Sequence, residues 1–377
     1  MNISTKCVHG ASNNSHNTGA VSVPIYQSAT FSHPGVGVST GYDYSRLQNP
    51  TREHLEELVA NLEGGYDAMA FSTGMAAISL SMELFSPGDH IIATADLYGG
   101  SIRLFDHISK KNGIEVTYLD TSDLDTVSSS IQPNTKAIYI ETPTNPTMQV
   151  TDIALICTLA KKHNLLTLVD NTFLTPYFQQ PISLGADIII HSGTKYLGGH
   201  NDTLAGFLVT STKEISDRLR FLYKTIGACL SPFDSWLLIR GIKTLSLRME
   251  KQQENAIEIA NYLKTHEKVK KLYFIGLEDH KDYAITKRQS TGFGGMISFE
   301  VDSKETAIHL LESVKLIQYA ESLGGVETLI TYPKLQTHAD VLEEERLKRG
   351  INDGFLRLSV GIENVKDLIK DLETALK

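Results

Sequence analysis

Residues 187–200 read DIIIHSGTKYLGGH, a short apolar run followed by a glycine-rich loop that contains Lys195. The run Asp187–Ile190 has a glycine near each end, which predicts a buried strand of a parallel sheet. Lys195 then lies beyond the carboxyl end of that strand, where open α/β sheets bind their ligands. A partly desolvated lysine can lose its proton and form an imine with a carbonyl cofactor, and the hydroxyls of Ser192 and Thr194 beside it suit a phosphate. A surface lysine in a glycine-rich loop is the alternative that this segment leaves open.

A second apolar run, residues 165–170, ends in the carboxylate of Asp170. Enzymes that use pyridoxal 5'-phosphate (PLP) need an acidic group against the pyridine nitrogen, because a protonated ring is the better electron sink. Asp170 is the candidate for that group, although an aspartate after a strand is also common as a helix cap or turn residue. Together with Lys195 at the end of a neighbouring strand, it indicates a PLP site.

Three loops upstream add candidate contacts for such a cofactor. Asn145 stands between two prolines that stiffen its loop, so its amide could bond a ring oxygen, and an Asx turn before Pro146 is the alternative. The small residues around Gly74 and Met75 lead into a helix whose first amides could bind a phosphate, or form an ordinary capped start. Tyr98, on a glycine-flanked turn, could stack on the ring or fill a surface gap.

Matches of this kind continue in order along nearly the whole chain. The sequence resembles the PLP enzymes of Cys/Met metabolism: cystathionine γ-synthases, cystathionine γ- and β-lyases, methionine γ-lyases and O-acetylhomoserine sulfhydrylases. The stretches that carry the resemblance include 42–46, 71–75, 96–100, 141–146, 169–172, 191–196, 321–325 and 357–361. The resemblance implies the α/β architecture of fold type I PLP-dependent transferases, with a mostly parallel seven-stranded sheet sandwiched by helices, a smaller C-terminal α+β domain and an extended N-terminal arm.

The resemblance also implies roles for residues around the cofactor. Lys195 would be the Schiff-base lysine and proton shuttle, Asp170 would pair with the pyridine nitrogen, and Tyr98 would stack on the ring and act as acid/base or nucleophile activator. Asn145 would contact the ring oxygen. The phosphate would be held within the same chain by the backbone amides of Gly74 and Met75 and the hydroxyls of Ser192 and Thr194. A neighbouring subunit would add the side chains of Tyr44 and Arg46.

The substrate side of the site follows from the same resemblance. Arg357 would bind the α-carboxylate, a planar anion that suits a bidentate guanidinium. Glu321 could hold the distal ammonium of cystathionine, with a solvated charge beside a glycine turn as the alternative. Arg103 could receive the distal carboxylate, although a surface ion pair on a helix is equally ordinary. The backbone around Ser322, with Asn145 and Thr337, would complete the substrate site.

Among the reactions of the family, these features favour cystathionine γ-synthase, which joins cysteine to an O-acyl-homoserine. Gly100 stands where many methionine γ-lyases have a cysteine. The segments 233–236 and 331–333 resemble those of bacterial γ-synthases. Cystathionine γ-lyase and β-lyase are the alternatives, because some of them share the acid at Glu321. A methionine γ-lyase is disfavoured, as is an O-acetylhomoserine sulfhydrylase, for which the chain is short.

The chain divides into three parts. Residues 1–49 are rich in Ser, Asn, Gly and Thr, and are expected to form an arm that contacts a neighbouring subunit. Residues 50–240 alternate helix-length segments with short apolar runs, which predicts a PLP-binding large domain with strands near 68–71, 90–94, 116–119, 137–141, 165–170, 187–191 and 205–210. Residues 241–377 are expected to form the small domain, with strands near 295–301, 316–320 and 355–360. The resemblance implies a homotetramer, a dimer of dimers with active sites shared between subunits.

Composition excludes several other classes of protein. The 377 residues include 35 basic and 44 acidic side chains, a net charge of −9, without a basic run that would indicate nucleic acid or anionic lipid. The three cysteines lie far apart, as expected for reduced thiols of a cytoplasmic protein. The spacing of His191 and His200 fits no usual metal site, so no metal is expected. No signal-like start and no apolar run of membrane-spanning length is present, which predicts a soluble protein.

Two further classes can be weighed on single features. A nicotinamide dehydrogenase needs a glycine fingerprint between a strand and its helix, but the nearest approach, Gly292–Gly295, precedes a strand. A binding protein built on a PLP-enzyme fold would be expected to have lost Lys195, Asp170 or Arg357, and all three are present.

Overall fold

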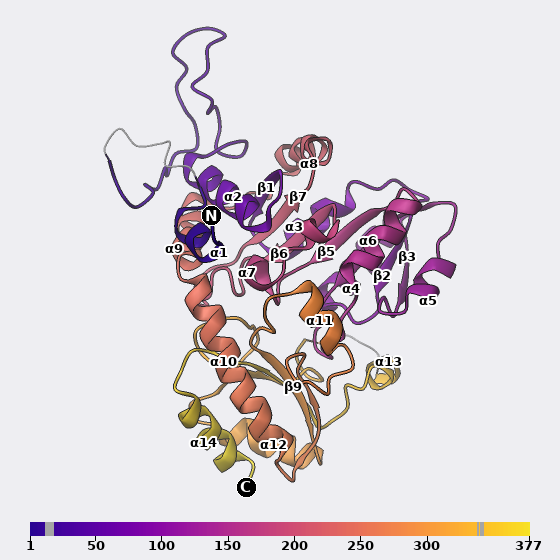
Figure 1. Cartoon of the computed structure of the whole chain (residues 1–377). Helices are drawn as coiled ribbons and strands as arrows, with labels where there is room; N and C mark the ends of the chain where they lie inside the picture. The colour runs from indigo at the N-terminus through magenta and orange to yellow at the C-terminus, as the bar shows by residue number, and fades with distance from the viewer. Residues whose placement is uncertain (12–18, 338, 340–342) are drawn as a thin grey trace.

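The structure is a computed structural model that describes residues 1–11, 19–337, 339 and 343–377. Two β-sheets organise the chain, and the long helix α10 (Leu245–Lys264) runs from one to the other (Figure 1). The larger sheet belongs to the N-terminal two thirds of the chain, and the smaller sheet to the C-terminal third. Among the described residues, no helix is both long and apolar enough to cross a membrane.

The larger sheet has seven strands in the order β1-β7-β6-β5-β4-β2-β3. Strands β2 to β6 are mutually parallel, whereas β7 is antiparallel to both of its neighbours. The seven strands predicted from the apolar runs are confirmed, to within a few residues: β1 (Asp67–Phe71), β2 (His90–Thr94), β3 (Glu115–Leu119), β4 (Thr135–Glu141), β5 (Leu166–Asp170), β6 (Ile188–Ser192) and β7 (Gly206–Thr210).

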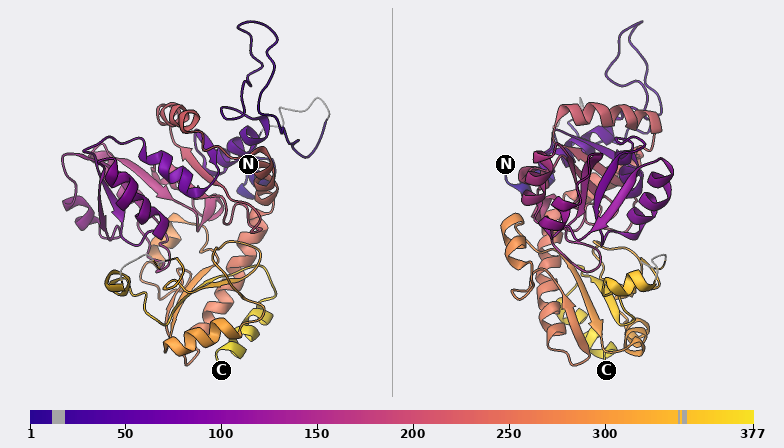
Figure 2. Two further views of the ribbon diagram at one scale, coloured as in Figure 1. Left: turned by 180° about the vertical axis from the view of Figure 1, so that it is seen from behind. Right: turned by 90° about the vertical axis from the view of Figure 1, so that its right-hand side faces the viewer.

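Both faces of this sheet are buried, which explains why its strands are continuous apolar runs. Successive residues of β6 alternate between two apolar clusters, with Ile189 in one and Ile188 and Ile190 in the other. Helices lie on both faces (Figure 2). They are α2 (Pro50–Glu63), α3 (Gly74–Met82), α4 (Gly99–Arg103), the π-helix η1 (Leu104–Ser109), α5 (Leu124–Ser129), α6 (Ile153–Lys162), α7 (Thr175–Phe178), the 3-10 helix η2 (Pro181–Leu184), α8 (Lys213–Ile226) and α9 (Pro232–Ile242).

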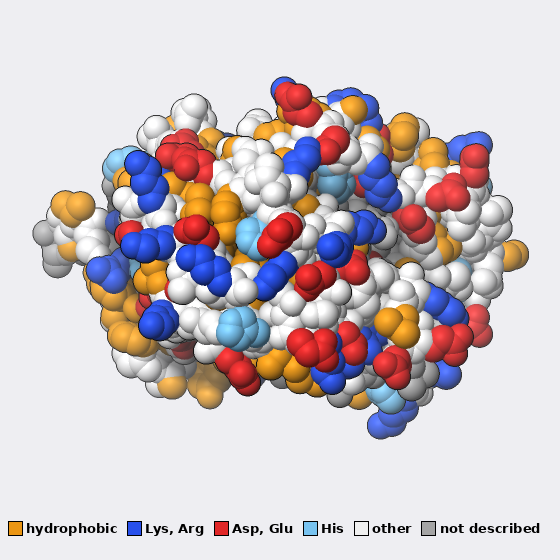
Figure 3. All heavy atoms as spheres, turned by 90° about the horizontal axis from the view of Figure 1, so that it is seen from below, with side chains coloured by type: hydrophobic (Ala, Val, Ile, Leu, Met, Phe, Trp, Pro, Cys, Tyr) orange, Lys and Arg blue, Asp and Glu red, His pale blue; other side chains and the backbone are white. Residues whose placement is uncertain are grey.

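The smaller sheet has five strands in the order β10-β11-β12-β9-β8. These are β8 (Val269–Tyr273), β9 (Met296–Val301), β10 (Gln318–Tyr319), β11 (Leu329–Thr331) and β12 (Phe355–Ser359). Helices α11 (Tyr283–Gln289), α12 (Lys304–Ser313), α13 (Glu343–Lys348) and α14 (Val365–Ala375) accompany them. Seen from below, this end of the molecule exposes acidic and basic side chains interspersed with one another (Figure 3). The predicted strand at 316–320 is reduced to the two residues of β10, and β8 and β11 were not predicted.

The N-terminal segment begins with a helix that the sequence did not predict. α1 (Ile3–His9) packs against α2 and α10 and buries Cys7 completely. From residue 19 to residue 49 the chain has only isolated β-bridges, such as Thr30 with Tyr44, and it projects from the body of the molecule (Figures 1 and 2). Val21 and Val36 are almost fully exposed there. The segment therefore has the form of an arm that projects from the body and is anchored to it by contacts such as the hydrogen bond from the Tyr26 amide to Thr51.

Candidate active site

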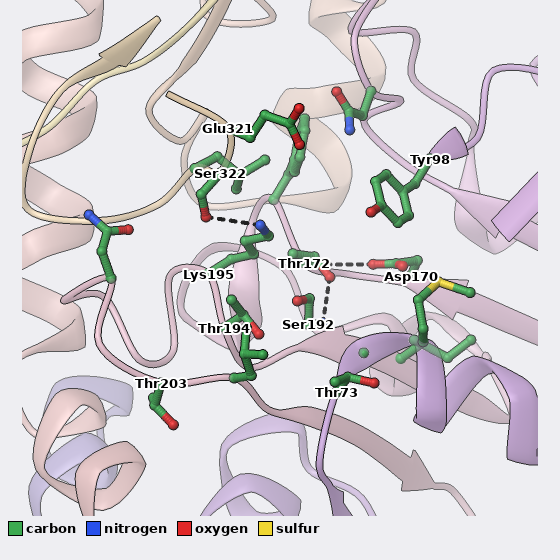
Figure 4. A pocket seen from close by; sticks show the side chains of 18 of the residues that line it. Thr73, Tyr98, Asp170, Thr172, Ser192, Thr194, Lys195, Thr203, Glu321 and Ser322 are labelled. Carbon is green, nitrogen blue, oxygen red and sulfur yellow. Dashed lines mark hydrogen bonds between the residues drawn. The ribbon is translucent and has the colours of Figure 1, made fainter. Parts of the chain in front are cut away.

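A cavity of about 1120 Å³ opens at the carboxyl ends of the parallel strands, between the two sheets. Its walls come from both parts of the chain, so it exists only because the two are packed together. Twelve of the fifteen predicted site residues line it: Gly74, Met75, Tyr98, Asn145, Asp170, Ser192, Thr194, Lys195, Glu321, Ser322, Thr337 and Arg357. Figure 4 shows the Lys195 side chain extending into this space, with Ser322 and Glu321 to one side and Tyr98 across from it.

Lys195 follows β6 as predicted, and its amine is held in the middle of the cavity. Its Nζ donates a hydrogen bond to Oγ of Ser322 at 3.0 Å. Burial, and secondarily the guanidinium of Arg357, lowers the pKa of Lys195 to about 8, while Glu321 acts in the opposite direction. A useful fraction of the amine is therefore neutral near neutral pH, which is the form that attacks a carbonyl or accepts a proton.

Asp170 lies at the end of β5, on the same face of the sheet as the cavity. Its Oδ1 accepts a hydrogen bond from the backbone amide of Thr172 at 3.0 Å, and Oγ1 of Thr172 in turn accepts one from the amide of Ser192 at 2.9 Å (Figure 4). Burial raises the pKa of Asp170, and the hydrogen bonds from Thr172 and the nearby His191 oppose that rise. A cationic ring nitrogen against this carboxyl would hold it ionised, so the position fits the role predicted from sequence.

The start of α3 lies beside the end of β6. Thr73 caps the helix, with its hydroxyl accepting a hydrogen bond from the amide of Ala76 at 3.0 Å. Gly74 is pressed against Ser192, and a Cβ at position 74 would lie 3.1 Å from the Ser192 Cβ. This close approach brings the first amides of the helix next to the hydroxyls of Ser192 and Thr194, and such a group of donors at a helix N-terminus suits a phosphate.

Arg357, on β12, is fully buried and reaches back toward the larger sheet. It donates hydrogen bonds to Oδ1 of Asn145 at 2.9 Å, to the carbonyl of Ser322 at 2.9 Å and to Oγ1 of Thr331 at 3.1 Å. Its Nε is buried without a hydrogen-bond partner among the described residues. Burial lowers the pKa of Arg357 to about 10, so the guanidinium keeps its charge at neutral pH.

Two local conformations support these contacts. Ser322 has a φ of 136°, which is unusual for a residue other than glycine and costs on the order of 1–3 kcal/mol. This backbone conformation accompanies a carbonyl directed to Arg357 and a hydroxyl directed to Lys195. Gly100 leaves room for the Tyr98 ring, since a Cβ at position 100 would lie only 2.4 Å from Cε1 of that tyrosine. Both positions therefore shape the cavity through the backbone.

The remaining three predicted residues lie elsewhere. Tyr44 and Arg46 belong to the N-terminal arm, where the Arg46 guanidinium lies 5.5 Å from the centre of the Tyr44 ring and donates to the carbonyl of Lys224 at 2.5 Å. Arg103 is exposed at the end of α4. None of the three is among the described residues that line the cavity of this chain. Within the described ranges, no group of three or more His, Cys, Asp and Glu side chains could hold a metal ion.

Several residues of the site were missed in the sequence. Thr172 joins Asp170 to the Lys195 loop, and Glu141 accepts a hydrogen bond from the amide of Tyr98 at 2.9 Å. Thr331 bonds Arg357. The short spacing between Asp170 and Thr172 could have indicated the first of these contacts, because such pairs often form Asx turns. The other two contacts depend on loops and strands that only the fold brings together.

The fold and the cavity together define an α/β enzyme whose cavity, with Lys195 and Asp170 at the ends of central strands, suits PLP. The sequence pattern of the Cys/Met metabolism PLP-dependent enzymes matches residues 4–377, and the chain belongs to that family. Its cofactor is therefore PLP, and its substrates are amino acids of sulfur metabolism.

Relatives within the family carry out different reactions. The cystathionine γ-lyase of Bacillus subtilis (strain 168) is 51% identical over 377 residues, which cover 100% of both chains. A cystathionine β-lyase of Lactococcus lactis subsp. cremoris (strain MG1363) is 51% identical over 375 residues, covering 100% of this chain and 99% of the relative. The cystathionine γ-synthase of Haemophilus influenzae is 48% identical over 371 residues, covering 98% and 96%.

Solved structures agree with the fold. The crystal structure of cystathionine γ-lyase from Lactobacillus plantarum in complex with L-serine superimposes with a TM-score of 0.97 at 47% sequence identity. The match covers 100% of this chain and 98% of the other. The expectation of a fold type I architecture is thereby confirmed.

Proposed function

We propose that this protein makes or breaks the Cγ–S bond of cystathionine with PLP as its cofactor. The observation that carries the proposal is a single cavity lined by Lys195, Asp170, Arg357 and Glu321, in which the pKa of the Lys195 amine is lowered. Arg357 suits the α-carboxylate of an amino acid, and Glu321 suits a second ammonium group. Cystathionine carries an amino-acid group at each end, which matches both charges.

Each side chain has a defined task in this proposal. When bound, PLP supplies the electron sink that stabilises negative charge at the substrate carbon atoms. Asp170 would hold the ring nitrogen protonated, and the amides of Gly74 and Met75 would hold the phosphate together with the hydroxyls of Ser192 and Thr194.

Lys195 is the proton carrier. Its neutral amine removes the proton from the substrate Cα, and for chemistry at Cγ a proton must then leave Cβ. The hydrogen bond to Ser322 holds the amine in the cavity, and the hydrogen bonds of Arg357 to Asn145 and Ser322 fix the carboxylate-binding group opposite it. Tyr98, which lines the same cavity, would stack on the bound ring and assist as acid/base. The arrangement keeps base and substrate in one orientation, which is a large part of catalysis.

Two directions of the reaction are each favoured by an observation. Synthesis from an O-acyl-homoserine and cysteine is favoured by the segments 233–236 and 331–333, which resemble bacterial γ-synthases. Cleavage of cystathionine is favoured by two relatives that are each 51% identical, a γ-lyase and a β-lyase. The same set of side chains serves both reactions. The pocket differences that separate one such reaction from another change the transition-state binding free energy by only about 1–3 kcal/mol.

A product assay separates the candidates. Purified enzyme is given either cystathionine alone or O-acetyl- or O-succinyl-homoserine with cysteine. Release of cysteine, ammonia and a four-carbon keto acid identifies a γ-lyase, whereas net formation of cystathionine identifies a γ-synthase. Release of homocysteine and pyruvate would instead identify a β-lyase and contradict chemistry at Cγ, and so would the absence of turnover in either mixture.

We further propose that the cofactor site is completed by a second copy of the chain. Tyr44 and Arg46 lie outside the cavity of their own chain, on an arm that projects from the body (Figures 1 and 2). Exposed apolar side chains such as Val21 and Val36 on the same arm would be covered in a dimer. The proposed assembly is a homotetramer, a dimer of dimers, in which each arm brings Tyr44 and Arg46 to the phosphate of its neighbour.

A further inference from the structure

Two buried carboxyl groups connect the loops that follow β2 and β4. Asp96, in the loop after β2, accepts hydrogen bonds from the backbone amide of Thr147 at 3.3 Å and from its hydroxyl at 2.5 Å. In the opposite direction, Glu141 at the end of β4 accepts the hydrogen bond from the amide of Tyr98 at 2.9 Å. Each loop thus provides the acceptor of one connection and the donor of the other.

These two loops each carry a group that lines the cavity. The loop after β2 bears Tyr98, and the loop after β4 bears Asn145, whose Oδ1 holds Arg357 at 2.9 Å. The distance between the stacking ring and the carboxylate-binding guanidinium therefore depends on how the two loops are held together. Asp96 and Glu141 are each only 5% exposed, so the connections are shielded from competition by water.

Neutral hydrogen-bonding side chains would be enough to hold the two loops together, so a purely structural connection would not require acids. Three carboxyl groups, Asp96, Glu141 and Asp170, follow neighbouring strands, and Arg357 is a cation that faces Glu141 from the other sheet. Burial raises the pKa of Glu141 well above its usual range, and the charge of Asp170 adds to the rise. Burying such groups is costly unless each is hydrogen-bonded. The hydrogen bonds of the buried carboxyl groups therefore hold the two loops in position although burying these groups costs electrostatic free energy.

We propose that Asp96 and Glu141 form a carboxyl clamp that sets the position of Tyr98 relative to Asn145 and Arg357. They are positioning residues, since they act on the reaction through Tyr98 and Arg357. The inference deepens the proposed function, because it rests on the roles proposed there for these two side chains.

Two threonine-to-valine substitutions provide a matched test. Thr147→Val removes the hydroxyl that Asp96 accepts from, at the cavity end of β2 and β4. Thr135→Val removes the hydroxyl that bonds His90 at 2.8 Å, which joins the same two strands at their opposite end. The hydroxyl of Thr147 also bonds that of Thr144, and the hydroxyl of Thr135 also accepts from the amide of Gln132. Each change therefore deletes two hydrogen bonds of a buried threonine at one end of the β2–β4 pair, so a general loss of stability should be similar for both.

Three measurements distinguish positioning from stability. They are kcat for the wild-type reaction, the visible circular dichroism band of bound PLP, and hydrogen–deuterium exchange of peptides 96–101 and 142–149 in the cofactor-free protein. Thr147→Val should lower kcat by about tenfold, alter the band and accelerate exchange in both peptides, because small displacements near the reacting groups are costly. Thr135→Val should lower the unfolding temperature but leave all three at the wild-type values. If Thr147→Val and Thr135→Val gave the same kcat, dichroism band and exchange rates, the proposed clamp would be wrong.

The other half of the clamp supplies a second pair of variants, which keeps the test decisive if Thr147→Val does not fold. Glu141→Ala removes the acceptor for the Tyr98 amide, and Glu141→Gln keeps an oxygen at that position. Glu141→Gln should recover most of the dichroism signal and kcat that Glu141→Ala loses, and an equal loss in both would contradict the proposal. If the wild-type protein neither cleaves nor forms cystathionine in the product assay, the proposed function fails, while the exchange data still test the clamp.

Discussion

The Lys195 amine lies in surroundings that favour its neutral form. Burial and the neighbouring Arg357 lower its pKa from 10.5 to about 8, and its hydrogen bond to Ser322 keeps it inside the cavity. The neutral amine is the reactive form, so the environment that makes Lys195 useful also destabilises the cofactor-free protein whenever that amine is protonated.

This leads to a prediction for stability against pH. The folded pKa of about 8 lies below the unfolded value of 10.5, so the destabilisation is fully present below pH 8 and disappears as the pH rises to 10.5. Lys195→Met should therefore raise the free energy of unfolding of the cofactor-free protein by about 3 kcal/mol at pH 7. Urea unfolding at pH 7, 9 and 10.5 should show this advantage shrinking. An advantage that does not change with pH, or the same trend in the exposed control Lys110→Met, would contradict it.

A second prediction concerns the planar geometry of Arg357. Lysine at this position would keep the charge but lose the simultaneous hydrogen bonds to Asn145, Ser322 and the substrate. Arg357→Lys should lower kcat/KM about 100-fold, equivalent to about 2.7 kcal/mol of transition-state stabilisation. Steady-state kinetics with the substrate found in the product assay provide the measurement, and Arg240→Lys on an exposed part of α9 is the control. A kcat/KM within threefold of the wild-type value would refute the role of Arg357.

The first turn of α4 shows how a helix start shapes the site. Gly100 is the second residue of that helix, and a methyl group there would approach Tyr98 to 2.4 Å and the sulfur of Met75 to 3.0 Å. Alanine is otherwise the better helix former by about 1 kcal/mol. A substitution at this position therefore separates the fit of the tyrosine ring from the stability of the helix.

Gly100→Ala should accordingly reduce kcat by at least about tenfold through displacement of the Tyr98 ring, without lowering the unfolding temperature. The neighbouring buried hydroxyl of Ser101 has no hydrogen-bond partner among the described residues, so Ser101→Ala is the matched control and should behave as wild type. Parallel measurement of kcat and thermal unfolding decides the matter. Unchanged kcat in Gly100→Ala would show that the ring does not need this space.

The strands of the larger sheet were predictable because they are buried on both faces and therefore appear as continuous apolar runs. β8 was not predictable, since its sequence, VKKLY, lies at a sheet edge and exposes both lysines. β10 and β11 have only two and three residues, too few to show a period. α1 was missed because its seven residues, ISTKCVH, bury only Cys7. Such elements are determined by tertiary contacts more than by local pattern.

The residues of the candidate site also fall into those that the local sequence pattern predicts and those that only tertiary contacts determine. Lys195 and Asp170 follow strands that are visible in the sequence, so local reasoning placed both correctly at the carboxyl edge of the sheet. Arg357 meets Asn145 only because the smaller sheet packs over the larger one, and it was found through the family resemblance. Thr172 and Glu141 act by hydrogen bonds to backbone amides, which no residue pattern reveals. Arg103 was expected near the substrate but is exposed outside the cavity lining.

The molecule as a whole offers a test of the shared active site. Under the proposed sharing of sites, a chain with Arg46→Ala keeps Lys195 but cannot complete its neighbour's phosphate site, and a chain with Lys195→Ala keeps Arg46 but cannot catalyse. In a mixed dimer, the arm of the second chain should complete the cavity of the first. Each mixed dimer therefore contains one intact site and one site with both defects.

Unfolding and refolding a 1:1 mixture of the two variants should restore about a quarter of the wild-type activity, because half of the dimers are mixed and each has one intact site. Each variant refolded alone is the control and should remain nearly inactive. Size-exclusion chromatography with light scattering would report the assembly in the same samples. Activity in the mixture equal to the mean of the separate variants would show that Arg46 serves its own chain.

The identity of the lysine that carries PLP can be measured directly. The purified protein is reduced with borohydride, digested and mapped by mass spectrometry, with the absorbance of the bound cofactor recorded before and after. The structure predicts that the visible band is lost and that the pyridoxyl mass appears on the peptide containing Lys195 alone. A protein that binds no PLP, or a label on any other lysine, would contradict the assignment of the cavity as the active site.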